Sequence, residues 1–295
     1  MFSLPPVFDP FSYRERYPDL AGLRRSQLRE HWLNGGRREG RNAAPMESWA
    51  ELLHFLQPAR SILEIGPFDN PSIEFLRHHG VIVDYADYFS SEGLVERAAK
   101  TAGRNPDSVP CIRYVLSDGG YEQISEKYDA VVSRHCVEHQ PDLISHFLSV
   151  LPLLEPHGIY LFSMPNRLRC FDRHLPPTHL VHVLAAYLEK RFRPPLEAVL
   201  EHRCFTVPDW RNDADPADEL PLNLRERLDM ACREFEEHAY VDVHCWKFTE
   251  DSLRRIMHKL VQLCYLPFST KIRTYNLGNE FAVAMAFSPK AHSAF

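Results

Sequence analysis

Between residues 47 and 165, short apolar runs alternate with segments in which apolar positions recur at helical spacing. The helical spacing predicts helices over 49–57 and 141–154. The apolar runs are short and bounded by turn residues, which predicts strands at 61–66, 81–87, 112–118, 128–133 and 158–164. Strands that alternate with helices form a parallel sheet whose functional edge lies at the carboxyl ends of the strands. The pattern therefore predicts an α/β fold.

The alternation stops after Pro165 and resumes near Val241. The stretch between them contains two Pro-Pro pairs and two amphipathic helical segments, at 180–192 and 222–238. We expect it to be a mostly helical insertion beside the functional edge of the sheet.

The chain ends in a helix followed by two strands. The helix is predicted over 250–263 and the strands over 269–275 and 280–287. The linking sequence Asn-Leu-Gly-Asn favours a tight hairpin, because Asn and Gly tolerate positive φ. The pattern thus predicts a parallel sheet closed by an antiparallel hairpin.

The first 45 residues are rich in arginine and aromatic residues and lack the alternation of the rest. Two short helices are predicted over 11–17 and 26–33, and their apolar faces need a partner. The sequence therefore divides into a helical appendage at 1–45, a core at 46–166 and 242–295, and a helical insertion on the substrate side at 167–241.

Composition narrows the function classes. The 295 residues carry a formal net charge of −6, which argues against a nucleic-acid partner, because such binding rests on neutralised phosphates. No apolar run approaches the roughly 20 residues of a membrane span, and the start of the chain lacks the features of a secretory signal. Seven cysteines without CxxC spacing fit reduced thiols. We expect a cytoplasmic protein without a membrane span.

The loop after the first predicted strand carries candidate chemistry. Glu64 stands two residues before Gly66, where the backbone of a tight turn can approach a ligand closely. Asp87, at the end of the second strand, is placed to hold a ribose diol, and Asp84 on the same strand is the competing acid. Phe68 stands where a diphosphate-binding loop needs glycine, which argues against NAD.

The segments YDAVVSRHCVEHQ and LEPHGIYLF, the Glu64-x-Gly66 turn and the terminal hairpin together resemble the class I S-adenosylmethionine-dependent methyltransferases. The resemblance covers residues 47–165 and 242–287, although Phe68 and Asn70 replace further loop glycines of that family. It implies a Rossmann-like sheet of seven strands with S-adenosylmethionine as the cofactor. It assigns the cofactor site to Glu64, Gly66, Pro67, Phe68, Asp87, Asp118 and Ser133.

The segments MPNRLRCFDRHLPPTHL and DVHCWKFT resemble conserved segments of a narrower bacterial methyltransferase subgroup. This resemblance implies that Arg167 and Asp172 orient the acceptor. His244 lies in the second segment, where the chain returns to the sheet near the cofactor edge, and is a candidate for the acceptor pocket.

His135, Glu138 and His139 match the H-x-x-E-H spacing of some zinc peptidases. Such a site needs both histidines on one helical face, whereas the apolar run before His135 predicts the end of a strand. His135 and His244 are therefore preferred as catalytic residues, and His139 as a residue that fixes the turn. No metal ligand is assigned.

The N-terminal matches are Phe8, Asp9, Tyr13, Tyr17, Pro18, Asp19, His31, Gly36, Glu39, Gly40 and Arg41, with Trp32 in place of a tyrosine. This string resembles a short unit often found beside bacterial glycan-assembly glycosyltransferases. It implies a sugar or glycan-type acceptor and a glycan-assembly protein partner.

The leading hypothesis is O-methylation of such an acceptor, with His135 or His244 as the base, because a neutral histidine can deprotonate a hydroxyl at cellular pH. Two alternatives stay open. One is a catalytically silent methyltransferase-like interaction module in glycan assembly, and the other is a metal-dependent hydrolase that uses the histidine cluster.

Overall fold

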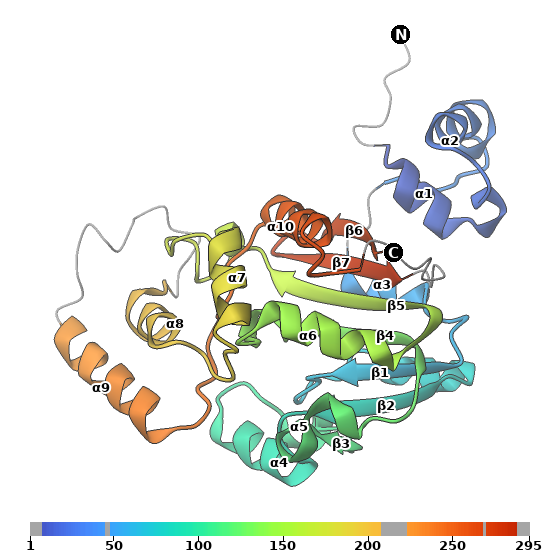
Figure 1. The fold of residues 1–295 in the computed structure, drawn as a ribbon. Coiled ribbons are helices and arrows are strands. Elements are labelled where there is room, and N and C mark those ends of the chain that lie inside the picture. Colours follow the sequence, from blue (N-terminus) through green and yellow to red (C-terminus); the bar gives the residue numbers. More distant parts are fainter. Residues whose placement is uncertain (1–7, 45–47, 208–222, 268–269, 288–295) are drawn as a thin grey trace, which may run out of the picture.

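The computed structural model of the protein describes residues 8–44, 48–207, 223–267 and 270–287 (Figure 1). In these ranges it holds a seven-stranded sheet in the order β3-β2-β1-β4-β5-β7-β6. The strands are β1 (Ser61–Ile65), β2 (Ile82–Asp87), β3 (Tyr114–Val115), β4 (Tyr128–Arg134), β5 (Leu154–Pro165), β6 (Thr270–Asn276) and β7 (Glu280–Phe287). Strands β1 to β5 are parallel, while β7 is antiparallel to β5 and β6. The predicted Rossmann-like sheet with its antiparallel hairpin is confirmed.

The third strand is shorter than the sequence predicted. It comprises only Tyr114 and Val115 of the predicted 112–118, and helix α5 (Leu116–Gly119) begins directly after it. In the described sheet, β3 lies at the edge and pairs only with β2, which ends at Asp87 opposite Val115. Backbone groups beyond Val115 have no strand to pair with, so they form helical hydrogen bonds instead.

Helices cover both faces of the sheet. Helix α3 (Trp49–His54) and the 3-10 helix η3 (Glu74–His79) pack on one face; α6 (Leu143–Val150), α7 (Leu180–Leu188) and α10 (Glu250–Gln262) pack on the other. Phe147 and Leu253 on this second face are fully buried, and each such side chain contributes roughly 1.5–3 kcal/mol. Within the described ranges, no helix is both long and apolar enough to cross a membrane.

The segment between β5 and α10 contains α7, α8 (Leu196–Leu200) and α9 (Leu224–Glu237). Helices α8 and α9 share a small hydrophobic cluster that includes Val199, Ala231 and Val243. Figure 1 shows these helices beyond the carboxyl end of β5. The predicted helix 222–238 corresponds to α9, while Leu222 lies outside the described residues. The insertion therefore adjoins the edge of the sheet at which the strands end.

The N-terminal segment packs around aromatic residues of its own. Helices α1 (Pro10–Arg16) and α2 (Arg25–His31) enclose the buried side chains of Tyr13 and Leu28. Residues 1–7 and 45 of the predicted appendage lie outside the described part of the chain. Ion pairs link the segment to the sheet domain: Arg16 Nε lies 2.6 Å from Glu51 Oε1, and Arg273 pairs with Glu15.

Candidate active site

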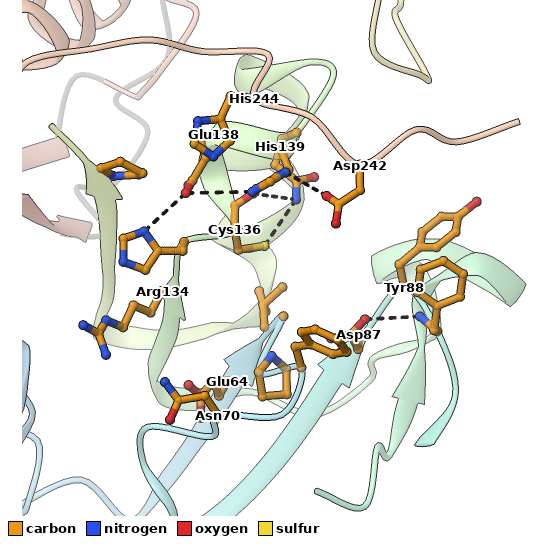
Figure 2. A pocket seen from close by; sticks show the side chains of 18 of the residues that line it. Glu64, Asn70, Asp87, Tyr88, Arg134, Cys136, Glu138, His139, Asp242 and His244 are labelled. Carbon is orange, nitrogen blue, oxygen red and sulfur yellow. Dashed lines mark hydrogen bonds and ion pairs between the residues drawn. The ribbon is translucent and has the colours of Figure 1, made fainter. Parts of the chain in front are cut away.

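A cavity of about 1100 Å³ opens at the carboxyl ends of the parallel strands (Figure 2). One end is lined by the loop after β1 and by the end of β2. The other end is lined by the turn after β4 and by the chain entering and leaving the insertion. The lining includes Glu64, Gly66, Pro67, Phe68, Asp87, Tyr88, His135, Glu138, His139, Phe171, His202, Asp242 and His244. The cavity therefore joins the predicted cofactor loop to the predicted catalytic histidines.

The loop after β1 is held in an unusual backbone conformation. Gly66 has a φ of 70° and Phe68 a φ of 47°, and the second is uncommon for a side chain of that size. A Cβ atom on Gly66 would lie 2.9 Å from Cys136 Sγ, so only glycine fits there. Asp69 anchors the loop: its carboxylate accepts hydrogen bonds from Arg104 Nη1 at 3.1 Å and Asn105 N at 2.8 Å. No pattern in the sequence marked this anchor.

Glu64 holds the same loop from the strand side. Its carboxylate is buried and accepts hydrogen bonds from Ser72 N at 3.0 Å and Ser72 Oγ at 2.6 Å. Burial raises the pKa of Glu64 to about 7, against the lowering effect of the Ser72 hydrogen bonds. Glu64 therefore shapes the loop with its carboxylate oxygens while its side chain lines the cavity.

Asp87 lies at the end of β2, buried and in the cavity wall. Its Oδ1 accepts a hydrogen bond from Phe89 N at 3.2 Å. Burial raises the pKa of Asp87 to about 6, although backbone hydrogen bonds from the following residues act in the other direction. The competing acid, Asp84, does not line the cavity, because its carboxylate pairs with Arg113 at 2.6 Å and accepts from Tyr128 at 2.8 Å.

The other predicted cofactor residues differ in their placement. Pro67 and Phe68 line the cavity. Ser133 does not line it: this residue is buried in β4, and its Oγ lies 2.8 Å from Tyr160 Oη. Asp118 belongs to α5, and its side chain lies outside the part of the structure that is described.

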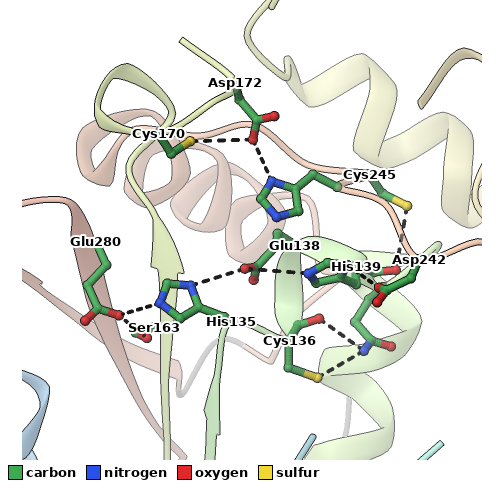
Figure 3. A network of polar contacts seen from close by, with 12 residues as sticks. His135, Cys136, Glu138, His139, Ser163, Cys170, Asp172, Asp242, Cys245 and Glu280 are labelled. Atoms are coloured by element: carbon green, nitrogen blue, oxygen red, sulfur yellow. Dashed lines mark hydrogen bonds and ion pairs between the residues drawn. The ribbon is translucent and has the colours of Figure 1, made fainter. Parts of the chain in front are cut away.

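The turn after β4 presents His135 with a φ of 51°. Both ring nitrogens face carboxylates: Nε2 lies 3.1 Å from Glu280 Oε2, and Nδ1 lies 3.4 Å from Glu138 Oε1 (Figure 3). Burial lowers the pKa of His135, but the two carboxylates outweigh it and raise the pKa to about 9. The pKa of Glu280 is held at about 2, because His135 and Arg134 outweigh the effect of its burial. At neutral pH, His135 is thus an imidazolium cation.

His139 connects this turn to the chain that leaves the insertion. Its Nδ1 lies 2.9 Å from Asp242 Oδ1, and its ring meets the ring of His244 edge-on at 4.8 Å. Burial lowers the pKa of His139, but Asp242 and Glu138 outweigh it and raise the pKa above its ordinary value. His139 therefore lines the cavity as well as joining two segments that are distant in sequence.

His244 and Asp172 form a buried pair. The Nδ1 atom of His244 lies 2.6 Å from Asp172 Oδ2, and His244 is only 6% exposed. The pair fixes the ring orientation, and Nε2 is the nitrogen that Asp172 leaves free. Asp172 itself does not line the cavity, but its partner His244 does.

Arg167, the other residue predicted to touch the acceptor, also lies outside the cavity wall. Its Nη1 donates to the carbonyl oxygens of Arg173 and Leu175, both at 2.8 Å. Arg169 and His202 line the cavity instead, and no pattern in the sequence marked them. The ring of Tyr240 stacks on that of Tyr88 at 5.1 Å, so the end of the insertion meets the loop after β2.

These residues fit S-adenosylmethionine at the β1 and β2 end of the cavity. The buried carboxylate of Asp87 is an acceptor suited to ribose hydroxyls, and Gly66 brings backbone close to the cavity without a Cβ atom. The strand order, with β7 antiparallel between β5 and β6, is that of a Rossmann-like methyltransferase sheet. The model of a family described as "Methyltransferase domain" matches residues 37–260. The chain belongs to this methyltransferase family, and S-adenosylmethionine is its cofactor.

Solved structures with a similar fold include three methyltransferases. The plantazolicin methyltransferase BpumL, in complex with a pentazolic desmethylPZN analogue and SAH, is 10% identical over 95% of each chain, with a TM-score of 0.42. The DhpI–SAH complex is 12% identical over 95% of this chain and 98% of that one, with a TM-score of 0.40. A SAM-dependent methyltransferase from Methanosarcina mazei is 16% identical over 83% of this chain and 100% of that one, with a TM-score of 0.40. None of the curated proteins matches the sequence.

Proposed function

We propose that this methyltransferase methylates a hydroxyl group of a sugar or a glycan-linked acceptor. The observation that carries the hydroxyl chemistry is the buried His244–Asp172 pair beside the cavity, with Nδ1 of His244 held at 2.6 Å. In Figure 2, His244, Glu138 and His139 lie at one end of the cavity, and Glu64 and Asp87 lie at the other. An acceptor at the histidine end would face a cofactor held at the carboxylate end.

When bound, S-adenosylmethionine supplies an electrophilic methyl group on a sulfonium centre. The protein has two tasks: to align the acceptor oxygen with that methyl group and to remove the hydroxyl proton. His244 suits the second task because Asp172 fixes its tautomer and ring orientation, and Nε2 can then accept the proton. The imidazolium formed at that point is stabilised by the carboxylate of Asp172.

Of the two predicted bases, His244 is the better one. His135 is already protonated at neutral pH, since its pKa is raised to about 9 and both ring nitrogens face carboxylates. We assign His135 the role of a fixed cation at the cavity edge. Asp172 is then a positioning residue for His244, and Arg167 supports the backbone of the insertion entrance.

At the cofactor end, we propose that Asp87 binds the ribose diol and that Gly66, Pro67 and Phe68 form the adjoining wall. Glu64 shapes this wall through Ser72. Asp118 remains a candidate for the adenine side. The division into an appendage at 1–45, a core at 46–166 and 242–295, and a substrate-side insertion at 167–241 belongs to the same proposal.

The assignment of a sugar acceptor rests on the N-terminal unit. Several of the residues that match this unit contact one another in the structure. Arg41 pairs with Asp19 at 2.8 Å and lies over the Tyr17 ring at 4.8 Å, and Tyr13 Oη lies 2.9 Å from His31 Nδ1. The matching residues therefore hold the segment together, and their resemblance to the glycosyltransferase-associated unit supports a context in glycan assembly. We propose a glycan-assembly protein as its partner and the bacterial cytoplasm as its location.

The test is the production of S-adenosylhomocysteine with a panel of sugar and nucleotide-sugar acceptors, measured for the wild type and single variants. His244→Gln should lower turnover by roughly 10²–10⁴-fold with nearly unchanged cofactor affinity, the range expected for general base catalysis. His78→Gln, on an exposed histidine outside the cavity, is the matched control and should leave turnover unchanged. Full turnover in His244→Gln would exclude His244 as the base. Methylation of amines but of no hydroxyl would contradict the acceptor class.

A further inference from the structure

Glu138, His139 and His244 bring three potential metal-ligand atoms together at the histidine end of the cavity. One ligand atom from each residue lies within 4.8 Å of the others. Glu138 is only 1% exposed, and within the described part of the chain neither of its carboxylate oxygens has a hydrogen-bond partner. The His135 imidazolium lies beside it, with Nδ1 3.4 Å from Oε1, so the lost hydration of this buried carboxylate is only partly replaced, which is costly.

Each of the two histidines has a carboxylate beside its Nδ1 atom, through a hydrogen bond in His244 and an ion-pair contact in His139. His244 Nδ1 lies 2.6 Å from Asp172, and His139 Nδ1 lies 2.9 Å from Asp242 (Figure 3). A carboxylate on one ring nitrogen fixes the tautomer and presents the other nitrogen as a ligand. The Nε2 atom of His139 lies 3.9 Å from Glu138 Oε1, so this free nitrogen is on the side of the unpartnered carboxylate.

We propose that Glu138, His139 and His244 form a binding site for a divalent transition-metal ion, with Asp242 and Asp172 as outer partners of the two histidines. Two imidazoles and one carboxylate suit Zn²⁺, Fe²⁺, Co²⁺ or Mn²⁺, whereas Mg²⁺ and Ca²⁺ prefer oxygen ligands alone. Glu138 supplies a carboxylate ligand inside the site, and the His135 imidazolium lies on its far side. All three residues line the cavity, so an acceptor in the cavity can reach the ion as a further ligand.

The ion can bind whatever the acceptor is, but the catalytic role of the ion rests on the proposed function. A hydroxyl bound to the ion would be more acidic than a free one and could give its proton to solvent. When the ion is bound, His244 Nε2 is one of its ligands and cannot accept the hydroxyl proton. The ion then activates the hydroxyl in place of the free histidine base.

The experiment uses the full chain without an affinity tag, treated with a chelator and then titrated with Co²⁺, followed by visible absorption and calorimetry. We expect one Co²⁺ per chain, with absorption bands of a cobalt ion bound to nitrogen and oxygen ligands. Glu138→Gln should bind far more weakly, and Asp242→Asn should weaken binding by roughly 10–100-fold, the usual effect of removing an outer partner. The double variant His78→Ala/His79→Ala, which removes two exposed histidines, should bind as the wild type does.

Titration with S-adenosylhomocysteine shows whether each variant keeps a folded cavity. If Glu138→Gln does not fold, Asp242→Asn carries the test. Absence of Co²⁺ binding in the wild type, or equal binding in the folded variants, overturns the metal site. If the chelator-treated chain methylates a hydroxyl at full rate before Co²⁺ is added, the ion has no role in the reaction and His244 remains the base. If Co²⁺ binds as expected but no hydroxyl is methylated, the metal site stands and the proposed acceptor class fails.

Discussion

At the scale of the residue, the two acids of β2 show what a sequence can and cannot determine. Asp84 and Asp87 are three positions apart, so they point to opposite faces of a strand. Only the register of the sheet decides which one meets the cavity, and the structure places Asp87 there and pairs Asp84 with Arg113. The same limit applies to Ser133, whose hydroxyl contacts Tyr160 on the neighbouring strand. Arg167 is a different case, because its side chain turns back to the carbonyl oxygens of Arg173 and Leu175 in the following loop.

Asp87 should make cofactor binding depend on pH. Because burial raises its pKa to about 6, Asp87 is a carboxylate above that pH and accepts hydrogen bonds from the ribose; it becomes protonated as the pH falls. Calorimetry should show S-adenosylhomocysteine affinity falling from about pH 7.5 to about pH 5.5. Asp87→Asn should bind more weakly at the higher pH by roughly 1.5–3 kcal/mol. The affinity of this variant should also depend much less on pH. The dependence that remains is expected from Glu64, whose pKa is raised to about 7. Equal affinity in both proteins at every pH would refute the ribose assignment.

At the scale of the element, the sequence predicted most strands and helices because each carries its own periodicity. It predicted the third strand too long at its carboxyl end, since β2 ends at Asp87 and offers no partner beyond Val115. It also identified the Glu64-x-Gly66 turn, but not the reason why glycine is needed there. That reason is the approach of Cys136 from the turn after β4, a contact between segments 70 residues apart.

Gly66→Ala should therefore be more harmful than another glycine substitution at positive φ. Gly80 has a φ of 78° but nothing within 4 Å of an added Cβ, so Gly80→Ala measures the backbone strain alone, about 1–2 kcal/mol. Gly66→Ala adds the contact with Cys136 Sγ at 2.9 Å and should displace the cofactor loop. Chemical denaturation and S-adenosylhomocysteine titration would compare the two variants. Cys136→Ala in the Gly66→Ala background should restore part of the affinity. Identical losses in the two glycine variants would show that the approach of Cys136 is unimportant.

At the scale of the whole molecule, the N-terminal segment and the methyltransferase core have separate hydrophobic clusters. The N-terminal cluster contains Tyr13, Leu20, Leu28 and Trp32, and the sheet domain has its own clusters on both faces. The contacts between them include the part-buried ion pairs Arg16–Glu51 and Arg273–Glu15. Because each part has its own hydrophobic cluster, we expect the core to depend little on the appendage for its stability.

Removal of residues 1–42 should leave a folded core that binds S-adenosylhomocysteine with nearly the affinity of the full chain, because every proposed cofactor residue and both faces of the sheet remain. The measurements are thermal unfolding and cofactor calorimetry. The matched control is Gly36→Ala in the full chain, since a Cβ atom there would lie 1.8 Å from Tyr13 Oη and disrupt the appendage without shortening the chain. Both variants should keep the unfolding transition of the core within a few degrees of the wild type, because a change of about 1 kcal/mol shifts the Tm of a domain this large by roughly 2–4 °C. Loss of soluble protein on truncation would show that the appendage is part of the core, and would remove the main support for a sugar acceptor.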